Sequence, residues 1–242
     1  MRYIYFFFSI FLTFQTNAKD YEYNFTWLKI PVSQVKISIM SQSIFSDNDG
    51  NIKFNIELLG PLKIIREYKS EIEINYNKVG WRYYLKGSDR GQSEEKEIHY
   101  FYGRAPKIIK FIDDKGASPL DVSLTMDNGT IDPLTVLVRT IKKLIDTENC
   151  DHIYNIFDGK RRYKVEARTL KKTNLNEMIQ CKYMLLSDKL SNDMNHLSSS
   201  NKWPFNREGR SLDIWFSKKI NYVPIKFIFD GPLGQISGEL EF

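Results

Sequence analysis

The stretch VPIKFIFDGPLGQISGELEF, residues 223–242, indicates the fold class of this chain. Apolar residues occupy alternate positions before and after the glycine-rich segment 230–234, as they do in half-buried β-strands. A connection of this length and composition joins adjacent antiparallel strands. The two runs therefore predict a β-hairpin, and its second strand places four residues on one face: Ile236, Gly238, Leu240 and Phe242.

The same period of two recurs along most of the chain, which predicts a mainly β protein. Further strands are predicted at residues 21–29, 33–45, 51–58, 71–76, 80–86, 95–102, 107–113, 179–185 and 212–216. Segment 151–168 adds a hairpin, in which Asp158-Gly159-Lys160 would form a three-residue loop. That loop pairs Phe157 with Arg161 and gathers the large apolar side chains on one side of the hairpin.

One segment has the spacing of a helix instead. Asp132 is a favourable N-cap residue, and Pro133 suits the first helical position, where its missing N–H costs nothing. Apolar side chains then recur at helical spacing, and the basic residues lie opposite them: Arg139, Lys142 and Lys143. These features predict one amphipathic helix at about 133–147, packed by its apolar stripe on the sheet. A shorter helical turn is predicted at 62–68.

The composition fits a globular domain and excludes several classes of protein. Hydrophobic residues make up 42% and charged residues 27% of the chain, so the chain is not mostly disordered. Two cysteines and three histidines exclude a cysteine-rich zinc module and leave little material for a histidine metal site. Lysine and arginine exceed aspartate and glutamate by 35 − 30 = 5 charges. This excess is modest and unclustered, so nucleic acid is not an expected partner.

The N-terminus has the pattern of a signal peptide. Met1-Arg2 supplies positive charge, Tyr3–Phe14 is an apolar run too short for a comfortable membrane-spanning helix, and small residues precede a cleavage point after Ala18. We expect residues 1–18 to be removed and residues 19–242 to fold as a single β-rich domain in the periplasm. An uncleaved N-terminal anchor is the alternative. No transmembrane helix is expected in the mature chain, because no later segment is long and apolar enough.

Export changes the interpretation of the two cysteines. Cys150 and Cys181 would lie in a compartment where disulfides form and persist. We therefore predict a Cys150–Cys181 disulfide, and two unpaired thiols, one of them a nucleophile, are the alternative. His152 follows Cys150 closely, but a Cys-His pair without a third ligand does not make a metal site.

Two groups of residues are candidates for ligand or partner contacts. Three cations at the tip of the predicted 151–168 hairpin would suit an anionic head group, a phosphate or an acidic partner, unless they are simply solvated: Lys160, Arg161 and Arg162. Large aromatic side chains, Trp215 among them, would line a concave apolar face or fill the core. The polar stretch 187–210 is unusually long for a loop in a compact domain, and we interpret it as a flap anchored by Trp203 and Phe205.

A set of motifs occurs in a definite order along the chain. They are Asp132-Pro133-Leu134, Phe157-Asp158-Gly159-Lys160-Arg161-Arg162-Tyr163, Cys181-Lys182-Tyr183, Leu212-Asp213-Ile214-Trp215-Phe216-Ser217, and the final hairpin with Pro224 and Gly234. In this order they resemble the bacterial family catalogued as domain of unknown function 3108. The resemblance covers essentially residues 19–242 and is best from Asp132 onward, whereas earlier it rests mainly on Trp27 in the first strand. It implies an exported envelope protein with a curved antiparallel half-barrel and a packed helix, similar to periplasmic lipoprotein carriers. It carries no catalytic residue to this chain.

The sequence lacks the common motifs of enzymes and cofactor sites, namely the dinucleotide and phosphate loops, HExxH and GxSxG. We therefore expect a non-enzymatic periplasmic or envelope protein without a cofactor or metal. It would bind an apolar, lipid-like ligand, or dock an envelope partner, on its curved sheet. Two alternatives stay open. One is an outer-membrane β-barrel ending at Phe242, because such barrels end in an alternating strand of this type. The other is an enzyme without a recognisable motif.

Overall fold

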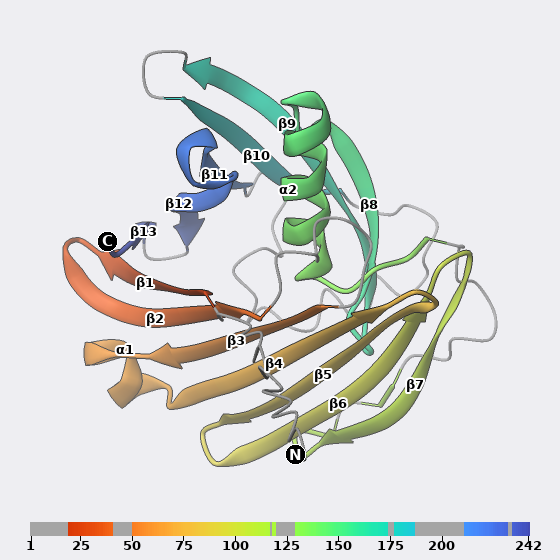
Figure 1. Cartoon of the computed structure of the whole chain (residues 1–242). Helices are drawn as coiled ribbons and strands as arrows, with labels where there is room; N and C mark the ends of the chain where they lie inside the picture. Colours follow the sequence, from red (N-terminus) through yellow and green to blue (C-terminus); the bar gives the residue numbers. More distant parts are fainter. Residues whose placement is uncertain are drawn as a thin grey trace, which may run out of the picture.

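A computed structural model of the chain describes residues 19–40, 50–116, 118–119, 129–173, 177–186, 211–231 and 234–242. These residues form one antiparallel sheet of thirteen strands that curves around a helix (Figure 1). The predicted fold class, a curved antiparallel sheet with one packed helix, is confirmed. The predicted signal peptide, residues 1–18, lies outside the described residues.

In chain order, the strands are β1 (Lys19–Trp27), β2 (Ile30–Ile39), β3 (Gly50–Leu58), β4 (Tyr68–Asn77), β5 (Gly80–Asp89), β6 (Gln92–Phe101), β7 (Arg104–Asp113), β8 (His152–Phe157), β9 (Arg162–Thr173), β10 (Met178–Leu186), β11 (Ser211–Ser217), β12 (Val223–Gly231) and β13 (Gly234–Leu240). The helices are α1 (Gly60–Ile65), α2 (Thr135–Thr147) and the short 3-10 helix η2 (Lys218–Ile220). α1 lies close to the predicted turn at 62–68, and α2 is the predicted amphipathic helix.

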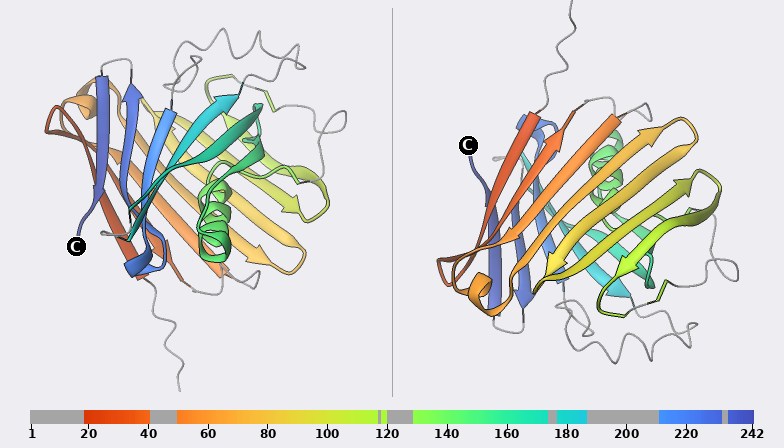
Figure 2. Two further views of the ribbon diagram at one scale, coloured as in Figure 1. Left: turned by 90° about the horizontal axis from the view of Figure 1, so that it is seen from above. Right: turned by 90° about the horizontal axis from the view of Figure 1, so that it is seen from below.

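Strands that are consecutive in the chain are neighbours in the sheet, with one exception, β7 and β8, which we call the break. One further pair, β1 with β13, joins the two ends of the chain, and we call it the junction. From β1 the sheet runs through β2 to β7 in one direction, and from β13 back to β8 in the other. The junction is the β1–β13 pair, which places Phe25 opposite Gly238. A Cβ atom at position 238 would lie 2.4 Å from the Phe25 ring, so glycine is needed there. The break falls between β7 and β8, where the chain inserts α2, and Figure 2 shows the strands wrapping around this helix.

The sheet stays open along β7 and β8. No backbone pairing joins these two strands in the part of the chain that the structure describes. The described residues therefore do not form a closed barrel with a last strand that ends at Phe242. β13 ends at Leu240, and Phe242 beyond it is 98% exposed.

The register of the β8–β9 hairpin differs from the predicted register by one residue. Phe157 pairs with Arg162, not with Arg161 as predicted, and residues 158–161 form the loop. The cause is Asp158, whose carboxylate accepts hydrogen bonds from two backbone N–H groups of the loop, at 2.9 and 2.8 Å. These bonds from a side chain to its own loop stabilise a longer turn than the apolar pattern indicates.

α2 lies on the concave side of the sheet and packs on it with one side (Figure 1). It begins at Thr135, later than predicted, but Asp132 still caps its first turn by accepting the backbone N–H groups of Leu134 and Thr135, at 2.9 Å each. The buried side of the helix consists of Thr135, Val136, Val138, Thr140, Ile141 and Leu144. Ile145 continues the apolar spacing of the helix but is exposed, as are the residues that follow it to position 148. None of the described helices is long and apolar enough to cross a membrane.

Cys150 and Cys181 are bonded, as the sequence predicts. Their Sγ atoms are 2.12 Å apart, and both residues are fully buried. The bond joins the segment that follows α2 to β10. The backbone N–H of Cys150 also donates to the hydroxyl of Thr169 on β9, at 2.9 Å. The end of the helix is therefore attached to two strands.

Removing the disulfide should lower the free energy of unfolding by about 3–4 kcal/mol, because the unfolded chain is then no longer closed into a long loop. The double variant Cys150→Ala/Cys181→Ala tests this in urea unfolding against the oxidised wild type. Wild-type protein treated with a reductant is the control and should lose a similar amount. An unfolding free energy that neither treatment changes would contradict the bond.

Candidate functional site

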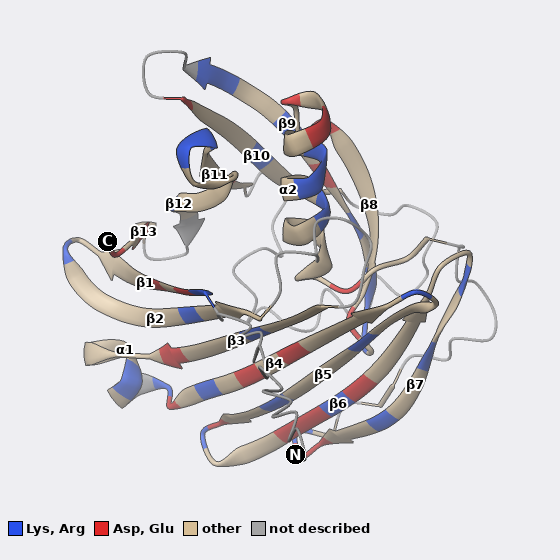
Figure 3. Ribbon diagram, viewed as in Figure 1, with Lys and Arg blue, Asp and Glu red and all other residues tan. Residues whose placement is uncertain are grey.

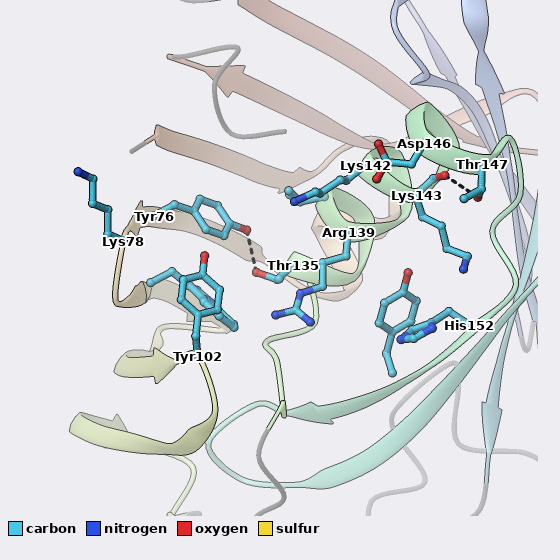
Figure 4. Close-up of a pocket in the computed structure, with 13 residues that line it drawn as sticks. Tyr76, Lys78, Tyr102, Thr135, Arg139, Lys142, Lys143, Asp146, Thr147 and His152 are labelled. Carbon is cyan, nitrogen blue, oxygen red and sulfur yellow. Dashed lines mark hydrogen bonds between the residues drawn. The ribbon is translucent and has the colours of Figure 1, made fainter. Parts of the chain in front are cut away.

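A pocket of about 920 Å³ lies beside α2 (Figure 4). Its other side is formed where β4 ends, β5 begins, β6 ends and β8 begins. Its volume falls within the range of pockets that hold small organic ligands. From the sheet and its turns, the lining residues are Tyr76, Lys78, Trp81, Tyr102, His152 and Tyr154. From α2, they are Thr135, Val138, Arg139, Lys142, Lys143, Asp146 and Thr147.

Aromatic side chains form one wall of the pocket, which we call the aromatic wall: Tyr76, Trp81 and Tyr102. Tyr76, Trp81 and Tyr100 lie opposite one another on β4, β5 and β6. The Trp81 ring stacks on that of Tyr100, with centroids 5.2 Å and planes 4° apart. The ring centroids of Tyr102 and Trp81 are 5.7 Å apart. Tyr102 is 44% exposed, whereas Trp81 is 3% exposed. Tyr102 is therefore the most exposed ring of the aromatic wall.

A buried carboxylate holds this wall against the start of α2. Asp132 is fully buried and accepts hydrogen bonds from the indole N–H of Trp81, at 2.7 Å, and from the hydroxyl and backbone N–H of Thr135. The hydroxyls of Tyr76 and Thr135 are also hydrogen-bonded, at 2.8 Å. Burial raises the pKa of Asp132, and these hydrogen bonds oppose the rise because they stabilise the carboxylate. The rings and the helix are thus connected through one residue.

The opposite wall is the basic side of α2. The cations that line the pocket are Lys78, Arg139, Lys142 and Lys143. Figure 3 shows that basic residues occupy the middle of α2 and acidic residues its end. The guanidinium of Arg139 lies 5.5 Å from the centroid of the Trp81 ring, within the range of a cation–π contact. Asp146 is the one carboxylate among the described lining residues. The pocket therefore carries a net positive charge.

His152 is exposed to the electrostatic field of these cations. Its ring lies 4.6 Å from that of Tyr154, in an edge-on arrangement. Burial lowers the pKa of His152 below its ordinary value of 6.5, and the charges of Lys143 and Arg139 lower it further. The lowered pKa favours the neutral imidazole at pH 7.

The first of the predicted contact residues, Lys160, serves the fold instead of this pocket. Its ammonium group forms ion pairs with Glu94, at 3.1 Å, and with the buried carboxylate of Asp113. Gly159 has φ +88°, and a Cβ atom there would lie 3.1 Å from the side chain of Ile98. The tip of the β8–β9 hairpin therefore packs closely on β6 and β7. We call this contact the hairpin clasp: Glu94, Asp113, Gly159 and Lys160.

Three more predicted contact residues, Arg161, Arg162 and Trp215, are described, and they also lie away from the pocket. Arg161 pairs with Asp158 within its own loop, at 2.6 Å, and Arg162 begins β9. Trp215 is half-buried in β11, next to the buried Ile214. Outside the described residues lie the predicted flap 187–210 and its two anchors, Trp203 and Phe205.

The sequence did not predict the pocket, because its walls come from distant segments. Helical spacing correctly places Arg139 and Lys143 opposite the apolar stripe of α2. It does not indicate that the side of the helix with these two residues lines a pocket. The two cations are four positions apart, and like charges at that spacing are the one local signal of a site. No signal in the sequence places Tyr102 or His152 beside them. Among the residues that the structure describes, no group of three or more His, Cys, Asp or Glu side chains could hold a metal ion.

Comparisons with known proteins give a family and a fold. A family model described as "Protein of unknown function (DUF3108)" matches residues 21–241. No curated protein sequence matches the chain. A crystal structure of a β-barrel-like protein of the domain of unknown function DUF1849 from Brucella abortus aligns with a TM-score of 0.57 at 11% identity, over 93% of this chain and 94% of that one. The hypothetical protein CT021 from Chlamydia trachomatis aligns with a TM-score of 0.36 at 9% identity, over 91% and 84%. The first likeness shows a shared fold.

Breaking the hairpin clasp should destabilise the protein. Lys160→Met leaves the buried carboxylate of Asp113 without its cation, so we expect the free energy of unfolding to fall by about 1–3 kcal/mol. Lys171→Met, at an exposed lysine of β9, is the matched control and should change it by less than about 0.5 kcal/mol. Urea unfolding measures both, and equal effects of the two substitutions would show that the clasp contributes nothing.

The pKa of His152 should be below 6.5 and should rise in Lys143→Gln, because one repelling charge is removed while burial remains. Since the pKa of His152 is lower in the folded than in the unfolded protein, the unfolded protein takes up the proton first. The free energy of unfolding therefore decreases as the pH falls from about 7 through the folded pKa. An NMR titration of the imidazole resonances measures both pKa values. Lys86→Gln, at an exposed lysine outside the pocket, is the control and should leave the value unchanged. A wild-type pKa at or above 6.5 would contradict this account.

Proposed function

Because this chain belongs to the DUF3108 family of proteins of unknown function, we propose a function from the chemistry of its own pocket. We propose that it is an exported, non-enzymatic protein of the periplasm or cell envelope. It binds a small amphipathic, lipid-like molecule between the aromatic wall and the basic side of α2.

The amphipathic character of the pocket is the observation that carries this proposal. Aromatic and aliphatic groups such as Tyr102 and Val138 lie on its surface together with the cations of α2. A molecule that fills such a space needs an apolar body for the rings and a polar end for the cations. Lipid-like molecules have this construction.

The polar groups of the pocket support binding in preference to catalysis. The hydroxyl of Thr135 donates to the carboxylate of Asp132, which is the arrangement of a nucleophile with its base. Both residues are buried, however, at 1% and 0% exposure, and Asp132 also accepts the N–H groups that begin α2. The hydroxyl of Thr135 belongs to the pocket lining, but it is already hydrogen-bonded to Asp132 and Tyr76, so the pair acts as a helix cap.

Export is supported by the signal-peptide pattern of residues 1–18 and by the cysteines. The bond between Cys150 and Cys181 is of a kind that persists in oxidising compartments and is rare in the cytosol. A soluble ligand-binding protein of the periplasm would be consistent with both observations.

Native mass spectrometry, combined with solvent extraction, tests the proposal on protein exported by the cell and purified without detergent. We expect a polypeptide that begins at Lys19 and carries a bound small molecule. Tyr102→Ala should reduce the bound fraction roughly two- to tenfold, because it removes the exposed ring of the pocket. Tyr84→Ala is the matched control, since Tyr84 is a half-buried tyrosine of β5 outside the pocket.

An empty polypeptide mass in the wild type would contradict ligand binding. Crosslinking to an envelope protein would then favour the alternative function, docking of a protein partner on the curved sheet. A polypeptide that retains residues 1–18 would contradict cleavage of the signal peptide.

A further inference from the structure

We infer that the pocket holds its ligand by a phosphate group, bound at the basic side of α2 by Arg139 and Lys143. This inference rests on the proposed binding function and adds a chemical class of ligand to it. Phosphate esters of lipids and free phosphate share this chemistry, and the experiment below separates the two sources.

The charge of the pocket favours a dianion. With His152 neutral, the described lining residues carry a formal charge of 4 − 1 = +3. Asp146 follows Lys142 by four positions on α2, where opposite charges attract, so it offsets one cation at most. Arg139 and Lys143 are not paired with a carboxylate among the described residues. A phosphate monoester carries nearly two negative charges at neutral pH and three acceptor oxygens, which match this excess.

The free protein bears a local conflict that an anion would relieve. Arg139 and Lys143 are four positions apart on one side of α2, and like charges at this spacing destabilise a helix. Both also disfavour protonation of His152, whose pKa they lower. Local conflicts of this kind are expected mainly at functional sites. A bound anion would offset the repulsion between Arg139 and Lys143.

Arg139 is held in position before a ligand binds. Its guanidinium lies 5.5 Å from the Trp81 ring, and this ring is fixed by the hydrogen bond to Asp132 and by stacking on Tyr100. A cation–π contact is made by the charge of the guanidinium and does not use up its N–H groups. These groups form the fork that matches two oxygens of a phosphate. Such preorganisation lowers the entropy that binding costs.

Three soluble probes separate the head group from the tail. Octyl phosphate has the anion and an apolar tail, octyl glucoside has the same tail with a neutral head group, and inorganic phosphate has the anion alone. Each is titrated into the mature, disulfide-bonded protein below its critical micelle concentration, and binding is measured by isothermal titration calorimetry. We expect octyl phosphate to bind about tenfold more tightly than octyl glucoside, and to lose affinity as sodium chloride is added.

Substitutions then locate the anion. Arg139→Gln and Lys143→Gln should each weaken octyl phosphate binding about tenfold and leave octyl glucoside binding unchanged. Arg139→Lys keeps the charge without the fork and should fall between the wild type and Arg139→Gln. Lys107→Gln removes one positive charge from an exposed residue of β7 outside the pocket, so it is the matched control. Melting curves establish that each variant is folded, and the two glutamine variants test the same site independently.

The outcomes distinguish this inference from the proposed function. Equal affinities for octyl phosphate and octyl glucoside, unaffected by both glutamine variants, would overturn phosphate recognition and leave the lipid-like pocket in place. Inorganic phosphate that binds as tightly as octyl phosphate, and is lost in the same variants, supports the anion site with free phosphate as the source. Binding of none of the probes overturns the inference, and the native mass spectrum then decides the proposed function separately.

Discussion

The buried carboxylate of Asp132 accepts hydrogen bonds from the sheet through Trp81 and from the first turn of α2 through Thr135. A buried charge is tolerated only where enough donors converge on it, because its transfer out of water is costly. Asp132 therefore fixes the start of α2 relative to β5, and with it the side of the helix that faces the aromatic wall. The position of Arg139 over Trp81 depends on that orientation, since the two residues belong to the elements that Asp132 joins.

The open edge of the sheet presents a second constraint. Long sheet edges expose unpaired backbone groups that can pair with other chains, and proteins commonly cover them or place charges there. Here the tip of the β8–β9 hairpin packs on β6 and β7 through side chains, and the hydroxyl of Tyr100 donates to the backbone carbonyl of Phe157, at 2.7 Å. Lys96, which is buried, donates to the carbonyl of Asp158 in the same region. The sheet is thus held in a curved shape by side chains where backbone pairing ends.

Local patterns in the sequence predict the fold well and the pocket poorly. Alternation predicts the strands, and Asp132 with Pro133 predicts the helix, because both depend on neighbouring residues. The hairpin register is wrong by one residue because the carboxylate of Asp158 closes a longer turn, which an apolar pattern does not reveal. The sequence predicts Lys160 as a contact residue, yet its ion-pair partners are on strands far away in the sequence. The pocket shares this property, since its walls meet only when the sheet curves.

The pairing of β1 with β13 has a consequence for the growing chain. Tyr23 lies opposite Leu240, so residues 240 − 23 = 217 positions apart must meet before either strand is fully paired. A nascent chain that has emerged only as far as β11 leaves one edge of β1 without its partner, and the apolar face beneath it is incomplete. Contacts of such long range also slow folding. The native sheet can therefore be completed only after the last strands have been synthesised, and the danger of aggregation is greatest in the incomplete chain.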